Sequence, residues 1–212
     1  MKLCVIGGAG ARSAFLTKSL VKSTRDIRVD HIVLLDNDQQ KLKTYGEISR
    51  ELSRRLDPDL TFEVTSDARA ALTGVDYIIT TIRAGGDAGR LFDEQTCLAH
   101  GVLGQETTGA GGFAMAIRSV PTLVYYCTLA REVANPGHLI FNFTNPSGII
   151  TQALRSKGFD NVYGICDAPS GFIKQLEEIL EIPYGTLDIE CYGLNHLSWF
   201  RNAKVNGRDV QR

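Results

Sequence analysis

Short apolar runs alternate with amphipathic helical segments along most of this chain, and that alternation constrains its fold more than any other feature. Strands that alternate with helices form βαβ units, in which a parallel sheet is covered by helices on its faces. The runs expected to be strands are 3–6, 32–35, 62–64, 77–81, 139–143 and 162–165. The segments expected to be helices are 11–21, 41–56, 91–100, 114–133, 149–157 and 171–180.

The alternation ends near Pro183. Two expected strands, 187–192 and 197–205, then follow each other with no helix between them. We interpret this change as the opening of a second, α+β region that is cut short at the end of the chain. The expected domains are therefore 1–183, an α/β domain, and 184–212, the start of a second domain.

Composition narrows the class of protein. Hydrophobic residues make up 43% of the 212 residues, which is ordinary for a globular protein. The net charge of −1 gives no electrostatic reason to expect nucleic acid or an anionic membrane as a partner. The five cysteines are odd in number and irregularly spaced, which favours a reducing compartment. We expect no stretch of ~18–20 apolar residues that could span a membrane and no signal segment, hence a cytoplasmic protein.

A glycine-rich turn lies between the first expected strand and the first expected helix. Gly7, Gly8 and Gly10 would let the backbone turn tightly and approach a pyrophosphate closely. The helix that follows would offer free N–H groups to the phosphates. Ser13 stands where a G-x-G-x-x-G motif has its third glycine. A tight turn without any ligand is the alternative interpretation.

Asp36 ends the second expected strand, where an acid can accept hydrogen bonds from ribose hydroxyls. The next residues, 37–38, include no arginine to bind a 2′-phosphate, so NAD is favoured over NADP. The alternative role for Asp36 is that of a helix N-cap. Together with the glycine turn, Asp36 predicts a Rossmann-type domain that binds NAD.

Polar clusters follow the later strands at the end where open α/β sheets bind ligands. Segment 83–86, followed by Arg90, comes after the strand 77–81. Segment 104–112 combines four glycines with Glu106, and segment 142–148 carries two asparagines suited to sugar hydroxyls. Flexible connections and Asx-capped turns are the alternatives for the last two segments.

Two further clusters contain residues that can bind a metal ion. Cys166 and Asp167 end one expected strand, and Asn195 and His196 lie between the last two. A thiolate and an imidazole would make a site of borderline-soft character. The alternative for Cys166 is a small buried apolar side chain, and the alternative for His196 is an ordinary polar side chain without a metal. Their spacing matches no common ligand motif.

In this order and spacing, these motifs resemble glycoside hydrolase family 4, the NAD- and manganese-dependent glycosidases, over nearly the whole chain. The motifs are Val5-Ile6-Gly7-Gly8, Leu35-Asp36-Asn37-Asp38, Gly101-Val102-Leu103-Gly104-Gln105-Glu106-Thr107, Asn142-Phe143-Thr144-Asn145-Pro146, Ile165-Cys166-Asp167-Ala168-Pro169 and Gly193-Leu194-Asn195-His196.

The resemblance implies a role for each matched residue. Cys166 and His196 correspond to the two manganese ligands, with the sugar's O2 and O3 hydroxyls completing the coordination. Asp167 corresponds to the proposed proton donor. Glu106 corresponds to the acid that raises the basicity of a catalytic tyrosine, which we expect beyond residue 212.

The resemblance also implies the substrate. Arg90 and Asn145 correspond to substrate-binding positions, and the substrate class would be 6-phospho-glycosides. Segments 104–109 and 112–116, together with 142–146, look most like the 6-phospho-β-glucosidase branch, whereas Cys166-Asp167 looks more like the α-acting branch. Tyr184 and Tyr192 precede the Asn-His motif, so neither corresponds to the tyrosine.

In the family's mechanism NAD takes hydride from C3 of the sugar, the acidified C2 proton is removed, the aglycone is eliminated, water adds and the hydride returns. The resemblance further implies a homo-oligomer, a dimer or tetramer, for the full-length protein. We expect residues 1–212 alone to bind NAD without hydrolysing glycosides. The alternatives are an NAD-dependent 2-hydroxy acid dehydrogenase, with an arginine clamp and a histidine acid/base, and a non-catalytic NAD-binding regulatory module.

Overall fold

The computed structural model describes residues 1–210, and their contacts divide the chain into two compact units. The first unit is Met1–Gly164 and the second is Ile165–Arg212. Helix α8 (Ala168–Ile179) thereby groups with the small second sheet, whereas the boundary expected from the sequence falls after residue 183. The extent of each folding domain stays a prediction, and the two units are described separately below.

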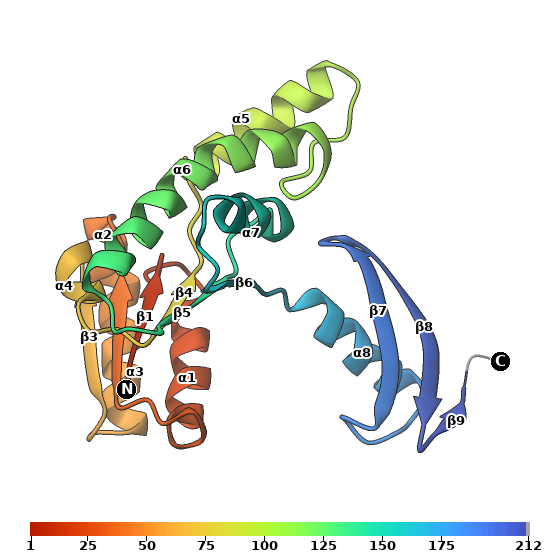
Figure 1. Cartoon of the computed structure of the whole chain (residues 1–212), viewed down its shortest axis with the longest axis horizontal. Helices are drawn as coiled ribbons and strands as arrows, with labels where there is room; N and C mark the ends of the chain where they lie inside the picture. The colour runs from red at the N-terminus through yellow and green to blue at the C-terminus, as the bar shows by residue number, and fades with distance from the viewer. Residues whose placement is uncertain (211–212) are drawn as a thin grey trace. The chain divides into compact units, whose positions relative to one another are not determined.

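A six-stranded parallel sheet forms the centre of the first unit (Figure 1). Its strand order is β3-β2-β1-β4-β5-β6, the order of the doubly wound dinucleotide-binding fold. The predicted α/β fold with a Rossmann-type sheet is therefore confirmed. The strands are β1 (Lys2–Ile6), β2 (His31–Leu35), β3 (Thr61–Thr65), β4 (Tyr77–Thr80), β5 (Leu139–Asn142) and β6 (Val162–Gly164).

The helices of the first unit mostly fall where the periodicity predicts them. They are α1 (Ser13–Ile27), α2 (Gln39–Lys41), the π-helical turn η1 (Leu42–Gly46), α3 (Glu47–Leu56), α4 (Ala68–Leu72), α5 (Gly86–Ala99), α6 (Gly109–Val133) and α7 (Ser147–Ser156). The short helix α4 was not predicted. Helix α6 begins five residues before the expected start at 114, and it lies beside α5 (Figure 1).

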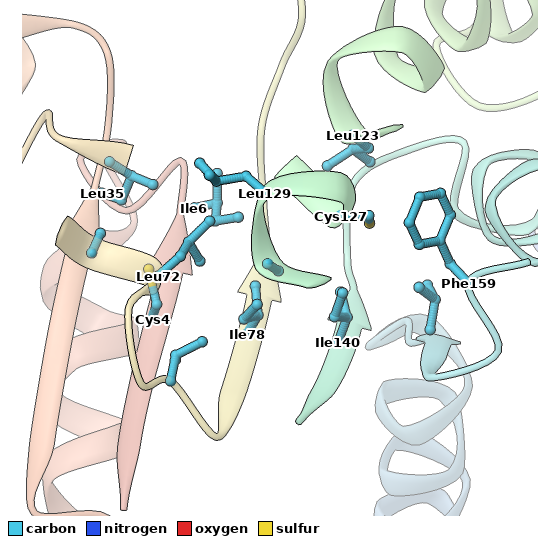
Figure 2. Packing of buried hydrophobic residues seen from close by; sticks show 14 of the residues in the cluster. Cys4, Ile6, Leu35, Leu72, Ile78, Leu123, Cys127, Leu129, Ile140 and Phe159 are labelled. Carbon is cyan, nitrogen blue, oxygen red and sulfur yellow. The ribbon is translucent and has the colours of Figure 1, made fainter. Parts of the chain in front are cut away.

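Apolar side chains cover both faces of the sheet, as parallel sheets require. Along β1, Cys4 and Ile6 pack into one cluster, whereas Leu3 and Val5 pack into the other. Figure 2 shows the first cluster, to which α6 contributes Leu123 among others. This packing holds the strands rigidly, so the loops at their carboxyl ends start from fixed positions.

Helix α6 corrects one expectation from the sequence. It contains an 18-residue window that is long and apolar enough to cross a membrane by length and composition alone, so the expectation that no such stretch exists is wrong. Residues such as Leu123 and Ala130 of this helix are buried in the core of the sheet. The core helix of a soluble protein can be equally long and apolar, so this helix is weak evidence for a membrane span.

The second unit contains α8 and a three-stranded antiparallel sheet of β7 (Leu187–Leu194), β8 (Leu197–Val205) and β9 (Arg208–Asp209). Strands β7 and β8 are the two that the sequence predicts after Pro183. Phe172 of α8 stacks on Phe200 of β8, with ring centroids 5.6 Å apart. Glu177, also on α8, is only 3% exposed, and its Oε1 accepts hydrogen bonds from the N–H groups of Thr186 (2.9 Å) and Leu187 (3.0 Å).

We expect Glu177→Ala to lower the free energy of unfolding of the second unit by about 2 kcal/mol, because it leaves one buried and one half-buried N–H donor without an acceptor. Glu177→Gln keeps an acceptor oxygen at the same place, so its free energy of unfolding should fall clearly less. Hydrogen exchange at the amides of Thr186 and Leu187 reports on this unit directly. Equal losses in the two variants would show that these hydrogen bonds do not stabilise the start of β7.

Candidate functional site

The turn after β1 shows two kinds of glycine. Gly7 has φ +82°, and a Cβ there would lie 2.6 Å from the carbonyl oxygen of Thr81. At Gly8 a Cβ would lie 2.9 Å from the carbonyl oxygen of Val5. Packing within the protein therefore requires glycine at both positions. A Cβ on Gly10 would meet no atom within 4 Å, so glycine there leaves open space that a close ligand can use.

Helix α1 begins directly after this turn with its positive end unneutralised. Its N-cap residue, Arg12, makes no side-chain capping hydrogen bond, and the first turn of the helix carries no acid. A helix N-terminus of this kind attracts phosphate through its N–H groups and its dipole. The open space at Gly10 and this helix end together fit the pyrophosphate of a dinucleotide.

Asp36 lies beside the glycine turn. Its Oδ2 accepts a hydrogen bond from the N–H of Ala9 (3.2 Å), and its Oδ1 accepts one from the N–H of Asp38 (3.1 Å). The N-cap of the following helix is Asp38, whose side chain accepts from two backbone N–H groups of α2. The alternative interpretation of Asp36 as the helix N-cap is therefore wrong, and its half-buried carboxylate remains suited to ribose hydroxyls.

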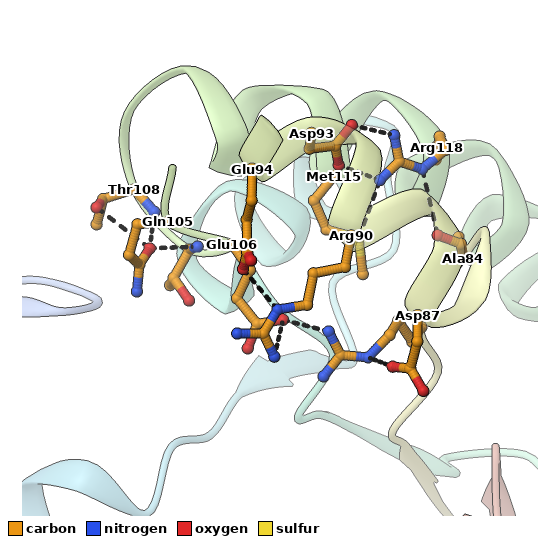
Figure 3. Close-up of polar contacts among 12 residues, drawn as sticks. Ala84, Asp87, Arg90, Asp93, Glu94, Gln105, Glu106, Thr108, Met115 and Arg118 are labelled. Carbon is orange, nitrogen blue, oxygen red and sulfur yellow. Dashed lines mark hydrogen bonds and ion pairs between the residues drawn. The ribbon is translucent and has the colours of Figure 1, made fainter. Parts of the chain in front are cut away.

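Arg83, which follows the carboxyl end of β4, forms a cluster of charged side chains with Arg90 and Glu106, the last two of which are labelled in Figure 3. Arg83 follows β4, and its Nη1 donates a short hydrogen bond to Oε2 of Glu106. Nη1 of Arg90, on α5, lies 3.7 Å from the same oxygen, and its Nε donates to Oε1 of Glu94 at 2.7 Å. The bond to Glu94 and then the charge of Glu106 raise the pKa of Arg90. The sequence singles out Arg83 but does not identify it as the partner of Glu106.

The loop that carries Glu106 is packed rather than loose. A Cβ on Gly104 would lie 2.7 Å from the carbonyl oxygen of Glu94, and one on Gly112 would lie 2.6 Å from the carbonyl carbon of Thr107. The side-chain oxygen of Gln105 accepts from the N–H of Thr108 at 2.7 Å. Gly104 and Gly112 thus serve close backbone packing, and the alternative of a flexible connection does not hold for them.

Asn142 and Asn145, both predicted to face a ligand, differ in the structure. Asn142 is fully buried; its Oδ1 accepts from Thr80 Oγ1 (2.9 Å) and from the N–H of Thr144 (3.2 Å), and its Nδ2 donates to Thr151 Oγ1 (3.1 Å). The capped-turn alternative therefore describes Asn142. Asn145 is half-buried, so of these two amides it is the one that can reach a ligand.

The second unit brings Cys166 and His196 together although 30 residues separate them. Cys166 Sγ lies 3.7 Å from His196 Nε2. Two ligands of one transition-metal ion, at bond lengths of about 2.0–2.3 Å and a tetrahedral angle, lie about 3.6 Å apart. Asp167 occupies the N-cap position of α8 without a capping side-chain bond, so its exposed carboxyl remains available to a substrate.

Cys4 and Cys127 of the first unit are buried, whereas Cys166 is half-buried. Burial raises the pKa of the Cys4 and Cys127 thiols to about 12, so they are protonated at neutral pH. Among residues 1–210 there is no cluster of three or more histidine, cysteine, aspartate or glutamate side chains able to hold a metal ion. Cys166 and His196 therefore supply two donors, which fits an ion whose remaining positions are open to water or substrate oxygens.

Comparison with known proteins extends this description. The 6-phospho-β-glucosidase BglT of Thermotoga maritima is 36% identical over 99% of this chain and 50% of its own length. The phospho-α-glucosidase PagL of Clostridium acetobutylicum is 33% identical over 93% and 45%. A structure of the Thermotoga maritima 6-phospho-β-glucosidase with manganese, NAD⁺ and glucose 6-phosphate has a TM-score of 0.91 at 34% identity, covering 99% of this chain and 51% of that one.

This chain spans about half the length of the curated relatives that it matches. The family model described as family 4 glycosyl hydrolase matches residues 2–182, which include the glycine turn, Asp36, Glu106 and Cys166. The strand order, the glycine turn and the ordered motifs agree with this match. The chain belongs to family 4 of the glycosyl hydrolases.

Proposed function

We propose that this chain is the dinucleotide-binding part of an NAD- and manganese-dependent glycosidase that cleaves 6-phospho-glycosides, with 6-phospho-β-glucosides as the favoured substrates. The observation that carries the proposal is the approach of Cys166 Sγ to His196 Nε2 at 3.7 Å. A Rossmann sheet alone also suits a 2-hydroxy acid dehydrogenase, but that chemistry has no use for a thiol and imidazole placed as two ligands of one ion. NAD would supply a reversible hydride acceptor and manganese a Lewis acid.

In the first unit the residues would bind the dinucleotide and the sugar. Gly7, Gly8 and Gly10, with the start of α1, would hold the pyrophosphate, and Asp36 would accept hydrogen bonds from the adenosine ribose. Arg90 would bind the sugar phosphate as a cation, and Asn145 would orient a sugar hydroxyl.

In the second unit Cys166 and His196 would hold the metal ion, which would supply Lewis-acid chemistry, and Asp167 would hold the proton that the departing aglycone takes. Glu106 of the first unit would raise the basicity of a tyrosine beyond residue 212, which removes the proton from C2. The residues therefore divide binding, proton transfer and metal ligation among themselves.

The preference for the β anomer rests on the segments around 104–116. Relatives that act on α- and β-linked substrates match this chain at similar identity, 33% and 36%, so overall similarity does not separate the two. Asp167 after the cysteine is the feature that favours the α-acting branch.

The test is nitrophenol release by the full-length protein from both anomers of nitrophenyl 6-phosphoglucoside, with NAD⁺ and Mn²⁺ each added or withheld. We expect release only with both additions, and faster from the β anomer. Release from the α anomer alone would correct the substrate. Release that is indifferent to both additions, in protein freed of cofactor and metal, would contradict the proposed function.

A further inference from the structure

Both arginines beside Glu106 make their nearest contact with the same carboxylate oxygen, Oε2. Arg83 Nη1 donates to Oε2, and Arg90 Nη1 lies 3.7 Å from that same atom. In the described part of the chain, Oε1 of Glu106 accepts no hydrogen bond. The carboxylate is therefore anchored at one end and free to accept at the other, with its side chain 21% exposed.

Arg83 is the stronger of the two anchors. Arg90 directs its Nε to Glu94 at 2.7 Å, and its nearest approach to Glu106 is an ion-pair distance rather than a hydrogen bond. The other acid near Arg83 is Asp87, whose Oδ1 lies 3.5 Å from Nε on a side chain that is 95% exposed. An ion pair so exposed to water contributes little, so the Glu106 contact governs where Arg83 points.

The loop that carries Arg83 is held in place by a neighbouring side chain. Arg118 of α6 donates from Nε to the carbonyl oxygen of Ala84 (3.2 Å), and its other two nitrogens pair with the carboxylate of Asp93, which is 7% exposed (Figure 3). A Cβ on Gly85 would lie 3.0 Å from Arg118 Nε, so this loop packs directly on the guanidinium. The position of Arg83 is thus set by the fold before any ligand binds.

We propose that Arg83 is a positioning residue for the reaction: it holds Glu106 through Oε2 and so presents Oε1 to the base whose strength Glu106 raises. The proposal rests on the proposed function, because it gives Glu106 the role assigned there. Arg83 acts only through Glu106 and does not contact the reacting atoms. Loss of the guanidinium would leave Glu106 free to rotate and would slow removal of the C2 proton, a step sensitive to displacements of about 1 Å.

The test uses the full-length protein with NAD⁺ and Mn²⁺. We expect Arg83→Met to lower kcat by about 10- to 100-fold while KM and the dissociation constant of NAD⁺ stay within about threefold. The kinetic isotope effect for substrate deuterated at C2 should rise, because proton removal becomes slower relative to the other steps. Arg83→Lys keeps the positive charge but lacks the planar guanidinium, so its kcat should lie between those of Arg83→Met and the wild type.

A double variant separates positioning from a general structural effect. If Arg83 acts through Glu106, Arg83→Met combined with Glu106→Gln should be no slower than Glu106→Gln alone. Asp87→Asn, which removes the other acid beside Arg83, is the matched control and should leave kcat unchanged. If the methionine variant fails to fold, Arg83→Lys is combined with Glu106→Gln in its place.

Multiplicative losses in the double variant, or a change in KM without a change in kcat, would overturn the role of Arg83 while leaving the proposed function standing. Wild-type turnover that needs neither NAD⁺ nor Mn²⁺ would instead remove the proposed function, and the role of Arg83 with it. The two failures are therefore distinguishable in one set of assays.

Discussion

Gly7→Ala is expected to abolish NAD⁺ binding and to lower the free energy of unfolding of the first unit by about 3 kcal/mol. The backbone at Gly7 has φ +82°, which disfavours any residue with a Cβ, and that Cβ would lie 2.6 Å from the carbonyl oxygen of Thr81. The β1 turn and the loop after β4 must then move apart. Calorimetric titration with NAD⁺ and denaturant unfolding measure the two effects.

Gly10→Ala is the matched control, because its Cβ would enter open space. We expect its stability to stay within about 0.5 kcal/mol of the wild type, as for substitutions that meet no neighbour. Its affinity for NAD⁺ should nevertheless fall clearly if the pyrophosphate occupies that space. Unchanged affinity in Gly10→Ala would mean that the dinucleotide does not approach the turn as we propose.

Cys166→Ser is expected to reduce manganese-dependent turnover of the full-length protein by at least about 10³-fold, because Lewis-acid stabilisation of the reacting sugar is worth several kcal/mol. The hydroxyl is a poor replacement for a thiolate ligand, while the size of the side chain hardly changes. Binding of Mn²⁺, followed by electron paramagnetic resonance, should weaken in parallel, and NAD⁺ affinity should not change. Full activity in this variant would exclude Cys166 as a ligand.

His196 allows a second check on the same site that does not depend on turnover. It occupies a two-residue turn between β7 and β8 with φ +115°, a conformation that glycine adopts readily and histidine does not. His196→Gly and His196→Ala should both lose the metal, but the glycine variant should be more stable than the alanine variant by about 1 kcal/mol. Equal stability of the two would show that the turn is unstrained.

The sequence predicts the first unit well because its signals are local. Buried parallel strands appear as unbroken apolar runs, and the glycine turn with Asp36 identifies the nucleotide end of the sheet. The start of α6 was predicted too late because Gly111 and Gly112 lower helix propensity. In the structure a Cβ on Gly111 would lie 2.6 Å from the carbonyl oxygen of Gln105, so packing selects glycine there against propensity.

The candidate sites were less accessible to sequence reasoning, because each depends on residues that only the fold brings together. Arg83 and Glu106 are 23 residues apart on two loops, and no periodicity relates them. Spacing alone does not pair Cys166 with His196 either. The family resemblance suggests that pair, and the turn between β7 and β8 brings His196 near Cys166. The burial of Asn142, in contrast with Asn145, likewise follows from Thr80 on the neighbouring strand and Thr151 on α7.

The glycine turn with Asp36 lies in one compact unit, and Cys166 with His196 lies in the other. Each set of side chains is therefore held by contacts that the other does not share. A chelator should remove a metal ion from the second unit and leave the first unit folded. A substitution in one unit need not disturb the other. Such modularity would let residues around the Cys166–His196 pair change without disturbing the glycine turn proposed to hold the dinucleotide.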